Sequence, residues 1–398
     1  MWRRLVSEGF RVFFLGAGVV ALVSMALWLA YLGGLFPALD ALPMPVQHWH
    51  GHELIFGYGG AALGGFFLTA VPNWTGAKAA PHRFIAMVAG VWLLGRLMIL
   101  ASGVVPPVMV GLVDLAFAPI LAAKIATQLL RRPKPQNMVF LLFLILFWLA
   151  NLRVHLDWMG MAWGDAGDGL RAGLMALAGM IAILGGRVTP AFTRNALHRA
   201  GIESSRPRDP KFFTPLIIVL AALLAASALV LPGTVFAAAI ALCAGAVMLL
   251  RVVLWATWFQ WGQPILWALH LSYGSVGFGL ILTGAARIDL LPEIAALHFL
   301  AIGGVGGMTV AVMSRATLGH TGRPLEAPRG VVLAYWALPL AALLRWGAGQ
   351  VTGDLSMLGL YGAGALWCAA YAGFLVCLWP AFWHPRLPRA PVGRAPPA

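Results

Sequence analysis

The stretch HWHGHELIFGYGGAALGGFFLTAV, residues 48–71, joins three histidines and a glutamate to an apolar run. A helix that crosses a bilayer needs about 20 apolar residues, and residues 51–71 are long enough to supply them. Ionisable side chains at the edge of a bilayer cost free energy, so their presence there indicates a function. Imidazole is the commonest protein ligand for transition metals, so this cluster is a candidate metal site.

The same apolar pattern recurs along the whole chain. The sequence is 61% hydrophobic and 10% charged, and its mean hydropathy is +0.86. We therefore predict an all-α polytopic membrane protein with about twelve transmembrane helices in a single transmembrane domain, residues 1–398. The predicted spans are 12–35, 51–71, 84–102, 106–130, 137–158, 169–186, 212–231, 233–256, 264–287, 292–314, 329–349 and 355–380.

The basic residues predict the orientation of these spans. When successive loops are assigned to alternate sides, most of the 27 Lys and Arg residues fall on one side. Cytoplasmic loops carry such an excess, so both termini are predicted to be cytoplasmic, as is the longest predicted loop, 187–211. The net charge of +14 then reflects topology in a lipid bilayer, and we expect no nucleic-acid partner.

The predicted cytoplasmic ends of spans 2, 6 and 10 share a composition rich in Thr, Arg and Asn. They read TAVPNWT at 69–75, RVTPAFTRN at 187–195 and MSRATLGHT at 313–321. Their spacing of four spans suggests a 4+4+4 pseudo-threefold repeat. Polar helix ends at a membrane surface are also common without any repeat, and both readings stay open.

The predicted topology separates the histidines by their position relative to the membrane. Those that lie inside the membrane or at its outer surface are His48, His50, His52, His155, His270 and His298. Spans 2, 5 and 10 bring all of these except His270 to one level on the outer side. His270 is predicted near the inner surface, where it would serve a second cofactor or bond a neighbouring helix. We therefore expect an outer-leaflet site for two metals.

Several metals suit this ligand set. Zinc prefers four fixed ligands, and Glu53 would supply one of them; copper accepts two or three imidazoles; haem iron needs one imidazole from each facing helix. Covalent c-type haem is excluded because no C-x-x-C-H is present, and we expect non-covalent haem b. We favour His52 and His298 as the haem ligands, and the remaining outer histidines are then available to copper.

Two arginines are further candidates. Arg153, near the outer exit of span 5, is a natural bidentate partner for a haem propionate. Arg96 lies deep in span 3, where an arginine must be paired. Asp114 in span 4 is the nearest carboxylate in sequence, and we predict that the two form an ion pair.

Several motifs resemble those of the NnrS family. HGHELIFGY at 50–58 and GFFLTAVPNWTG at 65–76 are the most specific of them. The likeness continues in GGRVTPAFTRN (185–195), HLSY (270–273), LHFLAIGG (297–304) and MSRATLGHTG (313–322), and so spans most of the chain. The departures are small: Leu54-Ile55 stands where Met-Leu is common, and Thr189-Pro190-Ala191 where bulkier apolar residues are usual.

The resemblance implies a twelve-span protein of the bacterial inner membrane that contains haem and copper. It also implies an association with nitric oxide metabolism and nitrosative stress. The histidine positions of the family match His50, His52, His155, His270 and His298.

Three functions are compatible with these features. The first is an oxidoreductase whose haem and copper bind nitric oxide and reduce or otherwise transform it, with electrons from quinol or a periplasmic donor. The second is a protein of metal or haem homeostasis, or a nitric oxide sensor, without turnover. The third is a transporter of haem or a small molecule. Transporters place their site near the bilayer midplane, and the crowding of the histidines toward one surface disfavours that reading.

Overall fold

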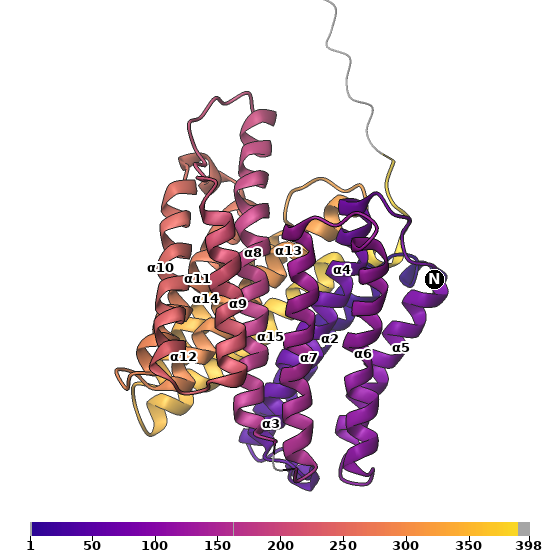
Figure 1. Ribbon diagram of the computed structural model, residues 1–398, viewed down its shortest axis with the longest axis vertical. Coiled ribbons are helices and arrows are strands. Elements are labelled where there is room, and N and C mark those ends of the chain that lie inside the picture. The colour runs from indigo at the N-terminus through magenta and orange to yellow at the C-terminus, as the bar shows by residue number, and fades with distance from the viewer. Residues whose placement is uncertain (1, 162, 389–398) are drawn as a thin grey trace, which may run out of the picture.

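The computed structural model describes residues 2–161 and 163–388, and within them every regular element is a helix (Figure 1). Twelve helices are long and apolar enough to cross a membrane, which confirms the predicted number. Their elements are α2 (Gly9–Leu32), α3–η2–α4 (Val46–Thr75), α5 (His82–Leu100), α6 (Pro107–Leu129), α7 (Pro135–Trp158), α8 (Ala166–Arg199), α9 (Phe213–Val230), α10 (Val235–Trp255), α11 (Pro264–Ala286), α12–η4–α13 (Glu293–His320), α14 (Arg329–Ala348) and α15 (Asp354–Trp383). The short elements are α1 (Trp2–Leu5), η1 (Pro37–Ala41) and η3 (Trp258–Gly262).

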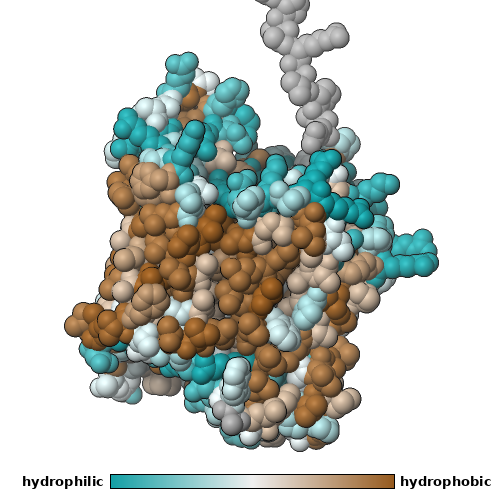
Figure 2. Space-filling model, viewed as in Figure 1, coloured by the Kyte–Doolittle hydropathy of each residue, from teal (hydrophilic) through white to brown (hydrophobic). Residues whose placement is uncertain are grey.

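The surface of the bundle is apolar between two polar ends (Figure 2). Large apolar side chains such as Leu94, Leu112 and Val376 point outward and are exposed. In water, an apolar surface of this extent would drive association, whereas in a bilayer the lipid tails solvate it. The chain is therefore a multi-pass membrane protein.

One predicted boundary is corrected by the structure. The segment 187–211 was expected to be a loop, but α8 continues through it to Arg199 and rises past its neighbours at the top of Figure 1. Pro190 lacks the amide N–H that would bond the Gly186 carbonyl. Arg251 donates to that carbonyl instead, at 2.9 Å, so the helix passes the proline without an unpaired oxygen there.

Spans 2 and 10 share an unusual construction. Span 2 begins as α3 (Val46–His52), changes to the π-helical segment η2 (Glu53–Tyr58) and continues as α4 (Gly59–Thr75). Span 10 repeats this order as α12 (Glu293–Phe299), η4 (Leu300–Gly306) and α13 (Gly307–His320). π-helical turns are rare and frequently lie at functional sites. Each of these two follows a short helix that ends in or next to a histidine.

The first described helix, α1, and the end of the last, α15, lie at the same end of the bundle, called the termini end below. Arg11 of α2 donates to the carbonyls of Ala381 and His384 there. The other end, where α3 begins, is called the histidine end (Figure 1). Span 6 (α8) contacts both η2 and η4, so spans 2, 6 and 10 meet at the centre of the bundle. The 4+4+4 repeat and the side of the membrane that each end faces stay predictions.

Candidate metal centre

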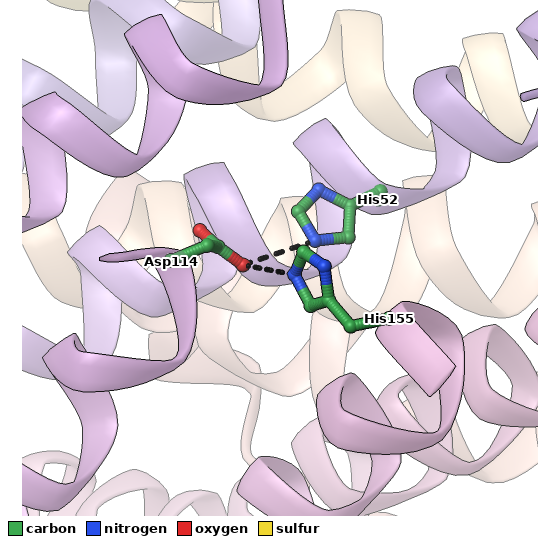
Figure 3. A group of neighbouring side chains, drawn as sticks. All are labelled: His52, Asp114 and His155. Atoms are coloured by element: carbon green, nitrogen blue, oxygen red, sulfur yellow. Dashed lines mark hydrogen bonds and ion pairs between the residues drawn. The ribbon is translucent and has the colours of Figure 1, made fainter. Parts of the chain in front are cut away.

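Three ionisable side chains from three spans meet inside the bundle (Figure 3). His52 ends α3, Asp114 lies on α6, and His155 lies near the end of α7. The Nε2 atoms of His52 and His155 are 3.2 and 2.9 Å from the same carboxylate oxygen, Oδ2 of Asp114. All three side chains are buried, and each offers one ligand atom within 4.8 Å of the others. Two imidazoles and a carboxylate form a donor set that zinc, copper and iron all accept.

The ring of His52 faces more acceptors than a neutral imidazole can satisfy. Its Nδ1 is 3.2 Å from Glu53 Oε1, and its Nε2 is 3.0 Å from Asn151 Oδ1 and close to the Asp114 carboxylate. The Asn151 amide cannot be reversed without loss, because its Nδ2 donates to Asp114 Oδ2 at 2.8 Å. A neutral imidazole carries one N–H, so one ring nitrogen would turn its lone pair toward oxygen. A second proton, or a cation bound at Nε2, removes this conflict.

The fixed charges around the group also favour a bound cation. Arg96 donates from Nη1 to Glu53 Oε1 at 2.7 Å and from Nη2 to Asp114 Oδ1, which confirms the predicted ion pair with Asp114. With neutral imidazoles, two carboxylates and one guanidinium leave one negative charge uncompensated. A buried, unpaired charge is costly. The arrangement is therefore suited to accept a cation.

Two glycines leave room for this network. A Cβ on Gly57 would lie 2.8 Å from Arg96 Nη1, and a Cβ on Gly95 would lie 2.8 Å from Asp114 Oδ1. Both separations are closer than carbon and polar atoms normally approach. The bare backbone of η2 and α5 thus lets the guanidinium lie between the two carboxylates.

A second pair of imidazoles lies on the other side of α3. The His50 ring stacks on Trp28 with centroids 4.5 Å apart, and its centroid is 6.3 Å from that of His298, with planes inclined by 13°. His50 Nδ1 is buried and has no hydrogen-bond partner among the described residues. His298 Nδ1 donates to the Ile294 carbonyl at 2.7 Å, which leaves the Nε2 lone pair free. Two adjacent imidazoles with free nitrogens are suited to bind a metal.

His270 has the same local arrangement as His298 but lies apart from the other histidines. Its Nδ1 donates to the Leu266 carbonyl at 2.9 Å, and its Nε2 is buried without a partner among the residues described. Its ring meets the edge of Trp255, at 6.5 Å between centroids. A backbone carbonyl at Nδ1 fixes the tautomer that exposes Nε2 as a ligand.

The remaining candidates have weaker geometric support. His48 has a buried Nδ1 without a partner in the described part of the chain, and no other histidine contacts its ring there. Arg153 donates to Asp168 Oδ2 at 3.0 Å and to the Leu229 carbonyl at 2.8 Å. Its guanidinium is thus already engaged, and its predicted role toward a haem propionate stays a prediction.

The family described as NnrS protein matches residues 4–386, which is nearly the whole chain. The chain belongs to the NnrS family. Membership of the NnrS family links it to nitric oxide metabolism. A search of curated protein sequences found no match.

The histidines that resemble those of the NnrS family fall into separate groups. His52 and His298 are the predicted haem ligands, whereas in the structure the His52 ring lies beside His155 and the His298 ring beside His50. Residues two apart on an α-helix point about 200° apart, so His50 and His52 cannot face the same neighbours. The cluster in span 2 therefore contributes to two groups of side chains, and the assignment of haem and copper to them stays a prediction.

Sequence reasoning missed two members of the group around His52. Asp114 was recognised only as a partner for Arg96, although an ionisable residue inside a span is itself a sign of function. Asn151 precedes His155 by four residues, so the two side chains share a face of α7. Glu53, predicted as a ligand, instead lies beside His52 Nδ1 and Arg96.

Proposed function

We propose that this protein binds haem b and copper and uses them to bind and transform nitric oxide near its histidine end. The observation that carries the proposal is the buried group of His52, Asp114 and His155, whose ligand atoms all lie within 4.8 Å of one another and whose excess negative charge favours a bound cation. Membership of the NnrS family gives the link to nitric oxide. We further propose that the protein lies in the bacterial inner membrane, with both termini cytoplasmic and the histidine end periplasmic.

Copper suits the group of His52, Asp114 and His155. Imidazole nitrogens and a carboxylate oxygen are ligands that copper accepts. With a metal at Nε2 of His52, its Nδ1 would donate to Glu53, and a carboxylate in this position orients the imidazole and raises its basicity. Arg96 holds Glu53 and Asp114 in place. The lone pair of His52 Nε2, which otherwise faces oxygen atoms, would thus bind the metal.

Haem suits the histidines whose Nδ1 is tied to a backbone carbonyl. His298 and His270 each present a free Nε2 in this way, and His50 lies beside His298. Haem iron would be held by one such imidazole nitrogen. When bound, haem and copper would supply redox centres at which nitric oxide coordinates and accepts electrons.

Nitric oxide is a substrate that can reach a buried centre. Nitric oxide is small and neutral, so it crosses an apolar bundle without a polar channel. Its reduction to nitrous oxide and water consumes electrons and protons in equal numbers. We propose quinol or a periplasmic protein as the electron donor, and the buried pair of His52 and Glu53 as the place where a proton is held near the centre.

The test is an optical spectrum combined with metal analysis of the purified full-length protein. We expect a Soret band that shifts on reduction with dithionite and again with nitric oxide, together with bound copper and formation of nitrous oxide. His52→Ala should lose copper, whereas His82→Ala, on an exposed side chain at the termini end, should not. Absence of both haem and copper would refute the cofactors. Binding of nitric oxide without consumption would instead favour sensing or metal homeostasis.

A further inference from the structure

A cleft at the termini end is lined by residues that take no part in the candidate metal centre. It encloses about 630 Å³ between α4, α8 and α13, far from the histidine end. Its ionisable lining residues are Arg315, His320 and Arg386, and no carboxylate lines it among the described residues. The rest of its wall is largely apolar and aromatic, as at Phe66, Trp74 and Phe192. The cleft thus combines two arginines with a largely apolar wall.

Arg315 has no carboxylate partner among the described residues, unlike Arg96 and Arg251. Arg96 and Arg251 are each paired with a carboxylate. The guanidinium of Arg315 instead lies over the Phe192 ring, with its central carbon 3.2 Å from the ring centroid. Within residues 2–161 and 163–388 it has no hydrogen bond or ion pair. Its five N–H donors therefore remain available to an anion in the cleft.

An apolar cavity borders this cleft. That cavity, of about 60 Å³, shares the side chains of Phe14, Phe66, Leu184 and Val312 with the cleft. Its only polar lining residue is Thr309, whose hydroxyl is bonded to backbone carbonyls of its own helix. A cleft with two arginines therefore lies next to an apolar cavity.

We propose that this cleft binds a single-chain amphipathic anion, such as an unesterified fatty acid taken from the adjacent leaflet. The acidic head would lie at Arg315 and Arg386, and the chain would run past Leu184 and Val312 toward the apolar cavity. An inorganic anion would leave most of the cleft unfilled, and a neutral lipid would leave Arg315 without a partner. Excess positive charge on cytoplasmic loops explains exposed arginines, but it does not require one that is stacked inside a cleft.

Photo-crosslinking of the purified full-length protein tests this proposal. The probe is a fatty acid with a diazirine at the end of its chain, and labelled peptides are mapped by mass spectrometry. We expect labels on the α4, α8 and α13 segments that line the cleft and its inner cavity. Decanoate should compete for the label, whereas decanol, which has the same chain but no charge, should not.

Two variants separate the head and the chain of the ligand. Arg315→Gln should weaken labelling about tenfold, because one charge-assisted interaction contributes roughly that factor in affinity. Arg329→Gln, an exposed arginine at the same end, is the matched control and should have no effect. Val312→Phe should abolish the advantage of long chains while decanoate still competes. Labelling spread over lipid-facing helices, or unchanged by Arg315→Gln, would overturn the proposal, and the metal content of each variant reports independently on folding.

Discussion

His50 and His52 lie two positions apart on α3, yet His52 contacts Asp114 and His50 stacks on Trp28. The helical twist turns their imidazoles to opposite faces. His52 joins α6 and α7 into one group, while His50 joins α2 and α12 into another. A short cluster in the sequence is thereby divided between two places in the bundle. This division determines which substitutions should act together and which should act independently.

Asp114→Asn should lower copper affinity by more than about tenfold. The change removes the anionic ligand and keeps the size of the side chain, and loss of even an outer partner of a metal ligand costs 10–100-fold. The measurement is copper content after dialysis against a weak chelator. Asp157→Asn is the matched control, because Asp157 is exposed at the same end of the bundle. Equal copper retention in both variants would show that Asp114 is not a ligand.

Arg96→Gln should destabilise the protein strongly. Arg96 pairs with Glu53 and Asp114, and removal of one partner from a buried ion network costs about 3–5 kcal/mol. The free energy of unfolding in mixed micelles measures the loss, and Arg96→Lys should restore part of it. The exposed Arg83→Gln should change stability by no more than about 0.5 kcal/mol. A stable Arg96→Gln protein would mean that the carboxylates are protonated and need no cation.

The sequence predicted the fold more closely than the site. Apolar runs of bilayer length predict spans reliably because, in lipid, a segment of this length satisfies all its backbone hydrogen bonds by itself only as a helix. The end of α8 was misjudged because Arg251, distant in sequence, compensates Pro190. The site depends on which helix faces which. Only packing brings Asp114 to His52, and no sequence spacing encodes that contact.

Gly57→Ala should disturb the ion network without touching a ligand directly. The new Cβ would lie 2.8 Å from Arg96 Nη1, so the guanidinium must shift away from Glu53. Such overpacking costs about 1–3 kcal/mol. Reduced stability together with reduced copper content is the expected result. Gly90→Ala, which meets nothing within 4 Å, should leave both unchanged.

The two histidine groups should behave as separate units in double-mutant cycles. His52→Ala and His155→Ala remove ligands of the same proposed metal, so the second substitution should cost little copper once the first is present. His50→Ala and His298→Ala should show the same coupling for the Soret band. For combinations across the groups, such as His52→Ala with His298→Ala, the effects on copper content and on the Soret band should be additive, since these side chains share no partner. Strong coupling between His52 and His298 in the haem signal would instead restore the pairing expected from the sequence and contradict the division that the structure shows.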